Sequence, residues 1–186
     1  MPTWLTPEEY ETLAAVCEFL IPADQTPGAA DAGVVDYIDR FLGAFSFDPP
    51  RIWAGGAFSG RQGGPAGFTE FHRLTSLDEL AWRTRIEGSL GLPEREFNGA
   101  VVGLQSRYRE GLVALGPDFC VCDRDEQDRR LRANAPFTKL VYEHCCEGMY
   151  GAPEYGGNRD GIGWSGIGVA GDVQPRGWSD AEVSEA

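Results

Sequence analysis

The chain is short of basic charge, and of lysine above all. Lys139 is its single lysine, and 16 basic residues stand against 29 acidic ones, which gives a formal net charge of −13. Nucleic-acid binding requires a basic face, and attraction to an anionic membrane surface requires a basic patch. The composition therefore argues against both kinds of partner, and solubility is the simplest explanation of the acidity.

Long apolar runs are absent as well, and no stretch approaches the length needed to cross a bilayer. The chain opens on Met1-Pro-Thr-Trp4, without the basic region and apolar core of an export signal. We therefore expect a cytoplasmic protein, or a periplasmic one if a leader is missing or an exported partner carries the chain.

Alternating polar and apolar runs, which would indicate strands, are also missing, and helical periodicity takes their place. Thr6 and Glu9 predict a capping box, with Pro7 in the first helical turn. Similar signals predict about five or six helices, over residues 6–21, 31–45, 76–86, 93–115, 123–131 and 136–148. The predicted fold is all-α: one helical domain over residues 1–150, with a glycine-rich loop at 55–67 and a long irregular C-terminal tail over 151–186.

The longest of these helices is predicted from Pro93 to Leu115. Its apolar residues recur at steps of mostly three and four, which is typical of a helix that buries one face. The residues expected on this face are Phe97, Val101, Leu104, Tyr108, Leu112 and Leu115.

Neither histidine nor serine is arranged for catalysis. His144 lies on the apolar face of the last predicted helix, where a hydrogen-bonded core or interface histidine is more common than a catalytic base. No serine stands in a G-x-S-x-G nucleophile elbow. The acids of residues 123–128 are interspersed with arginines, which is typical of a solvated helix face. We therefore assign no catalytic residue to this chain.

The five cysteines are an odd number, so at least one thiol cannot pair within the chain. Cys17 is predicted to be a small core residue. The other four cysteines and His144 are residue types that bind soft metals. Cys120 and Cys122 are separated by a single residue, and Cys145 and Cys146 are adjacent, so neither pair has the usual spacing of zinc ligands. We assign no metal ligand, and in an oxidising compartment a disulfide is favoured. The candidates for it are Cys120 or Cys122 with Cys145 or Cys146.

Glycines and aromatic residues concentrate in residues 147–168. The run from Gly161 to Gly166 matches G-x-G-x-x-G, but no strand precedes it and too little chain follows it for a βαβ unit, so we assign no cofactor-binding residue. Asn158 follows two glycines and fits a turn with positive φ, and its neighbours either lock that turn or reach a partner. Because aromatic residues and arginine dominate interface energies, the candidate partner contacts are Tyr150, Tyr155, Asn158, Arg159, Asp160 and Trp164.

Two regions give the chain a resemblance to a known family. The first comprises residues 5–24, 26–28, 32–34 and 37–40, with Leu20-Ile-Pro-Ala-Asp24 at its centre. The second comprises residues 144–148, 153–160, 163–164 and 167–168, with Gly156-Gly-Asn-Arg-Asp160 at its centre. Together they resemble the gluconate 2-dehydrogenase subunit 3 family, the small subunit of bacterial flavin-dependent sugar dehydrogenases.

The resemblance implies a non-catalytic subunit in a heterodimer. The large partner would be a flavoprotein of the glucose–methanol–choline type, which binds FAD and oxidises a sugar or sugar acid. The small subunit would be needed for the folding, maturation or export of that partner. In many relatives it would carry a twin-arginine leader and take the partner across the membrane as a hitchhiker. Some complexes add a cytochrome c as electron acceptor.

Two alternatives stay open at this point. The chain could be an independent metal- or thiol-dependent protein that uses Cys120, Cys122, His144, Cys145 and Cys146. It could also be a chaperone that releases its client.

Overall fold

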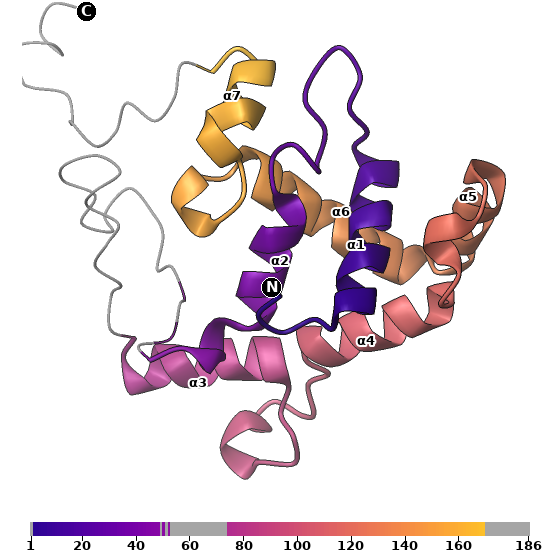
Figure 1. The fold of residues 1–186 in the computed structure, drawn as a ribbon. Helices are drawn as coiled ribbons and strands as arrows, with labels where there is room; N and C mark the ends of the chain where they lie inside the picture. The colour runs from indigo at the N-terminus through magenta and orange to yellow at the C-terminus, as the bar shows by residue number, and fades with distance from the viewer. Residues whose placement is uncertain (1, 49, 51, 53–73, 170–186) are drawn as a thin grey trace, which may run out of the picture.

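The computed structural model describes residues 2–48, 50, 52 and 74–169, and it builds them from helices (Figure 1). No strand occurs in these described residues, which confirms the predicted all-α class. The α-helices are α1 (Pro7–Leu20), α2 (Val34–Leu42), α3 (Ser76–Glu87), α4 (Leu104–Leu115), α5 (Arg124–Ala133), α6 (Ala135–Tyr150) and α7 (Ile162–Gly166). Short 3-10 helices are η1 (Ala44–Ser46), η3 (Pro93–Arg95), η4 (Phe119–Val121), η5 (Pro153–Tyr155) and η6 (Arg159–Gly161).

Two predicted features lie, wholly or in part, outside the described residues. The glycine-rich loop at 55–67 lies outside them, as do residues 170–186 of the predicted tail. Within the described part, no helix has the length and apolar character that a membrane span needs.

The first helix forms where the sequence predicts it. The Thr6 hydroxyl accepts a hydrogen bond from the Glu9 N–H, and the Glu9 carboxylate accepts one from the Thr6 N–H. This capping box satisfies two amides that the helix itself leaves unpaired. Leu13, Val16 and Cys17 are buried on the inner face of α1, so the prediction that Cys17 is a core residue is confirmed.

The predicted start of the second helix is wrong by three residues. The second helix was expected from residue 31, but α2 begins at Val34, because Gly33 takes a left-handed conformation with φ +68° that an α-helix cannot contain. The third helix, α3, begins at Ser76 as predicted, and its cap is formed by Thr75 with Asp78.

The predicted helix over 93–115 is correct only in its second half. After η3 the chain leaves the helical conformation and returns to it at Leu104. Asn98-Gly99 is a turn signal, and Gly99 has φ +101°, so the turn interrupts the helical periodicity. Phe97 and Val101, which the pattern placed in the core, are 93% and 41% exposed.

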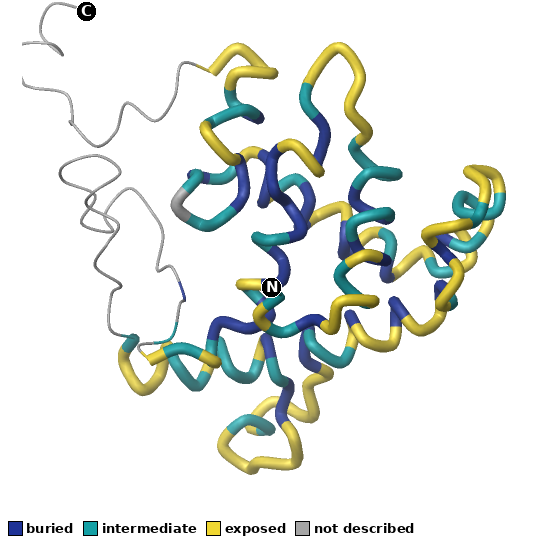
Figure 2. The backbone as a smooth tube through the Cα atoms, in the orientation of Figure 1, coloured by how far each residue is buried: buried dark blue, intermediate teal, exposed yellow. Residues whose placement is uncertain are grey.

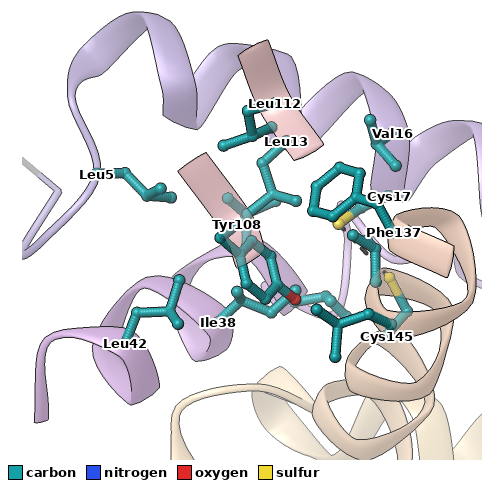
Figure 3. Packing of buried hydrophobic residues seen from close by; sticks show 14 of the residues in the cluster. Leu5, Leu13, Val16, Cys17, Ile38, Leu42, Tyr108, Leu112, Phe137 and Cys145 are labelled. Atoms are coloured by element: carbon teal, nitrogen blue, oxygen red, sulfur yellow. Dashed lines mark hydrogen bonds between the residues drawn. The ribbon is translucent and has the colours of Figure 1, made fainter. Parts of the chain in front are cut away.

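One hydrophobic core lies between α1, α2, α4 and α6. Tyr108 of α4 is fully buried, and Figure 3 shows its ring among side chains from these helices. Gly111 lets α4 approach α6 closely, because a Cβ at this position would overlap the Phe137 ring. Burial of such side chains stabilises each by about 1.5–3 kcal/mol relative to exposure.

The chain after α6 folds back onto the same helical body. Figure 1 shows α7, in yellow, next to the end of α6 and near α2. Residues 151–169, which the sequence assigned to an irregular tail, form η5, η6 and α7 with turns between them. This segment contains most of the candidate partner contacts, and its packing determines which of them are accessible.

Candidate functional site

Asn158 holds residues 151–169, named the returning segment, against the end of α6. Its side chain is fully buried and its backbone is left-handed, with φ +41°. Its N–H donates to the Gly148 carbonyl at 2.6 Å, and its amide nitrogen donates to the Gly151 carbonyl at 2.9 Å. Its Oδ1 accepts from the N–H of Gly163 at 2.8 Å. The predicted positive φ is confirmed, and the side chain acts as a local lock.

Arg159 connects the same segment to α2. Its N–H donates to the Ala32 carbonyl, and its guanidinium lies 2.8 Å from the Asp36 carboxylate. Asp36 also accepts a hydrogen bond from the Tyr10 hydroxyl at 2.7 Å. Partial burial, followed by this bond, raises the pKa of Tyr10 to about 12. Three segments that are distant in sequence therefore meet at one carboxylate.

The remaining candidates, at the end of α6 and in the segment 151–169, differ in their exposure. Trp164 is half-buried and donates its indole N–H to the Tyr150 carbonyl at 2.8 Å. Tyr155 is also half-buried, whereas Tyr150 is 39% exposed and Asp160 is exposed. Tyr150 and Asp160 are therefore the candidates with exposed side chains that do not tie the segment to other described residues.

The cysteines are all free thiols in the structure, and they lie in separate places. Cys145 Sγ is 3.5 Å from Cys17 Sγ, so its neighbour is the core cysteine and not one of the pair at 120 and 122. The hydrogen bond between the two thiols, together with burial, raises the pKa of Cys17. Cys122 contacts the Asp118 carbonyl instead.

Nothing in the described residues favours a metal site. No group of three or more histidine, cysteine, aspartate or glutamate side chains gathers there as a set of ligands. His144 is buried and shares a 2.7 Å hydrogen bond between its Nδ1 and the Tyr108 hydroxyl, and the two rings stack. Burial lowers the pKa of His144 and raises that of Tyr108. The pair is a hydrogen-bonded core contact, as the sequence favoured for this histidine.

His144 also borders a cleft of about 440 Å³ between α3, α4 and α6. Arg85 and Arg107 line this cleft, together with Glu143 and Glu147. These four charges all act on the His144 pKa, the two carboxylates raising it and the two guanidinium groups lowering it.

The two kinds of charge in the cleft differ in their partners. Glu147 accepts a hydrogen bond from Tyr37 at 3.0 Å, and Glu143 lies 3.4 Å from Lys139. Neither Arg85 nor Arg107 forms an ion pair with any acid of the described residues. The cleft thus offers hydrogen-bond donors to an external carboxylate.

Next to the cleft, the chain between α3 and α4 carries apolar side chains into solvent. This stretch, residues 88–103, is named the α3–α4 loop, and Figure 2 shows it as a mostly exposed excursion. The helical periodicity of the sequence did not reveal this surface, because it placed Phe97 and Val101 on a buried helix face. Its exposed side chains are Leu90 at 69%, Leu92 at 37%, Phe97 at 93%, Val101 at 41% and Val102 at 65%.

One comparison with known proteins found a match for this chain. The family model for gluconate 2-dehydrogenase subunit 3 matches residues 7–171, a range that contains every α-helix described above. A search of the curated proteins and a search of the solved structures each found no match.

Proposed function

Because the chain belongs to the gluconate 2-dehydrogenase subunit 3 family, we propose that it is the non-catalytic small subunit of an FAD-dependent sugar or glycoside dehydrogenase. The family match over residues 7–171 carries this proposal, since it makes the chain a subunit of a dehydrogenase complex. The large partner is a flavoprotein of the glucose–methanol–choline type. Where the complex includes a cytochrome c as a further subunit, that cytochrome accepts the electrons.

The flavin belongs to the large partner in this proposal, because the glycine pattern of this chain does not fit a dinucleotide. Gly163 packs directly on the Met149 carbonyl, and its N–H is already bonded to Asn158. The run from Gly161 to Gly166 lies in η6 and α7, and no strand of the described residues precedes it. A phosphate-binding turn needs free amides at a strand–helix junction.

The small subunit stabilises the folded form of the partner. A protein that binds the folded state and not the unfolded state shifts the folding equilibrium by mass action. The exposed apolar side chains of the α3–α4 loop support such a role, because five of them occur in one loop and apolar patches on a protein surface commonly mark interaction sites. Tyr150 at the end of α6 and Asp160 in the segment 151–169 are further candidate contacts, and Asn158 and Arg159 fix the shape of that segment.

Co-expression with a candidate flavoprotein of the glucose–methanol–choline type from the same organism tests the proposal. We expect a persistent one-to-one complex on gel filtration, with flavin absorbance and sugar-dependent dye reduction. The flavoprotein expressed alone should be insoluble or lack flavin, and the small chain alone should be inactive.

Two results would contradict the proposal. An active, flavin-loaded large protein without this chain would show that the chain is dispensable. A mature flavoprotein that elutes free after co-expression would instead indicate a chaperone that releases its client.

A further inference from the structure

The α3–α4 loop is held in one shape at its base. The Ser89 N–H donates to the Val101 carbonyl at 3.0 Å, and the Val101 N–H donates to the Ser89 hydroxyl at 2.8 Å. Arg95 lies 2.9 Å from the Glu87 carboxylate and also donates to the Gly88 carbonyl. The two ends of the loop therefore close on each other at the end of α3.

This closed base presents apolar groups at the far end of the loop. Phe97 is almost fully exposed, and Leu90 is 69% exposed with a left-handed backbone at φ +53°. Bulky residues rarely adopt this conformation, which costs on the order of 1 kcal/mol or more. Strained backbone and exposed aromatic surface are both unfavourable for the isolated chain, and both are typical of a preorganised binding element.

The loop and the charged cleft form one continuous surface. Val101 and Val102 belong to the loop and also line the cleft that contains Arg85 and Arg107. Because the glutamates of the cleft already have partners and the two arginines have no ion-pair partner among the described acids, an incoming carboxylate can pair with their guanidinium groups. Paired apolar and cationic anchors are characteristic of interface hot spots.

We propose that this surface docks the large catalytic subunit, with Phe97 entering an apolar hollow of that subunit and one of its carboxylates pairing with Arg107 in the cleft. The inference rests on the proposed function and specifies where the two subunits meet. The closed loop loses little freedom on binding, so its burial contributes efficiently to affinity.

Two other occupants fit the surface less well. A second copy of this chain carries the same net charge of −13, so self-association brings strong like charges together. An anionic lipid surface is repelled by the same charge. A large subunit with a local acidic group opposite Arg107 would pair with this cation without bringing two copies of the −13 charge together.

Binding measurements with the purified large subunit test the docking surface. Phe97→Ser removes the exposed ring without disturbing the core, and we expect it to weaken the complex at least tenfold. Arg107→Glu should weaken the complex at least tenfold as well, with a smaller loss at high salt because salt screens the charge repulsion. Far-UV circular dichroism and thermal unfolding of each isolated variant should match the wild type.

Two variants serve as matched controls. Val121→Ser changes a side chain that is 84% exposed in η4, away from the loop, and Arg132→Glu changes a cation that is 80% exposed on α5. Both should bind within twofold of the wild type.

The possible failures are distinguishable. If Phe97→Ser and Arg107→Glu bind like the controls, the docking surface is wrong although the complex exists. If the wild-type chain does not bind the flavoprotein at all, the proposed function fails first. If the wild type alone forms a dimer that Phe97→Ser dissolves, a second copy occupies the surface and the inference is overturned.

Discussion

The guanidinium of Arg159 lies 2.8 Å from the carboxylate of Asp36, so the segment that follows α6 is paired with the second helix, α2. Arg159 also fills the space over Gly33, where a Cβ would lie 2.7 Å from its Nη2 atom. The pair is partly exposed, with side-chain exposures of 56% and 33%, so the ion pair itself contributes no more than about 1 kcal/mol. The buried contacts around Asn158 therefore hold the segment more strongly than this ion pair does.

Gly163 and Gly166 provide a test of how tightly α7 packs. A Cβ at Gly163 would overlap the Met149 carbonyl oxygen, whereas one at Gly166 would meet Pro27 at an ordinary 3.4 Å. Gly163→Ala should destabilise the protein by about 1–3 kcal/mol through overpacking, measured by urea unfolding. Gly166→Ala, in the same helix, should be nearly neutral. Equal losses in the two variants would contradict the close approach of α7 to α6.

Asn158 combines a left-handed backbone with a buried hydrogen-bonding side chain, and two substitutions separate these contributions. Asn158→Gly keeps the backbone freedom and loses both side-chain bonds, so it should destabilise the fold by about 2–3 kcal/mol. Asn158→Ala should cost about 1 kcal/mol more, because φ +41° disfavours a Cβ. Urea unfolding of both variants measures the difference. If alanine proves no worse than glycine, the backbone contribution is absent.

The buried His144 predicts a dependence of stability on pH. Burial lowers its pKa in the folded state, so the unfolded chain binds more protons as the pH falls through the unfolded value of about 6.5. Stability is therefore complete above pH 7 and declines as the pH falls below about 6.5, with a limiting slope of about 1.4 kcal/mol per pH unit. Urea unfolding at a series of pH values measures this slope.

The variant His144→Asn provides the control for this prediction. Asparagine can still bond to Tyr108 but does not titrate, so its stability should fall less over the same interval. Acids with lowered pKa values, such as Asp118 at about 2, lose their stabilising charge only at lower pH. An unchanged slope in the variant would show that another group causes the decline.

The thiols should differ in their reaction with an aromatic disulfide reagent. Cys120 is exposed and should react first in the native protein, and the half-buried Cys122 and Cys146 should follow more slowly. Cys17 and Cys145 are completely buried and should react only after unfolding. Counting the released thiolate in native buffer and in urea measures this order. Rapid native reaction of Cys145, identified by mass spectrometry, would contradict its position in the core.

Local signals determined much of the fold from the sequence. The Thr6–Glu9 capping box is formed as predicted, because such a contact involves residues only three positions apart. The buried face of α6, including Leu140 and His144, also follows its helical periodicity. These elements need no distant partner to specify where they begin or which side they bury.

The α3–α4 loop shows where local pattern fails. Phe97 has the spacing of a core residue, but the Ser89–Val101 bonds and the turn at Gly99 turn the chain away from the helix. Both partners of that pairing are unremarkable in the sequence, and their approach depends on how α3 and α4 are placed. The exposed surface on which the docking proposal rests could not therefore be read from periodicity.

By itself, the sequence determined the all-helical class, the family and most helix boundaries, since these depend on contacts between near neighbours and on motif residues. Only the tertiary structure decided what the motif residues do. Asn158 and Arg159 were equally suited to a partner or to a local lock, and the packing of Gly148, Gly163 and Asp36 around them selects the lock. The physical reason is that a hydrogen-bonding side chain satisfies whichever groups the fold brings within reach, and those groups lie far away in the sequence.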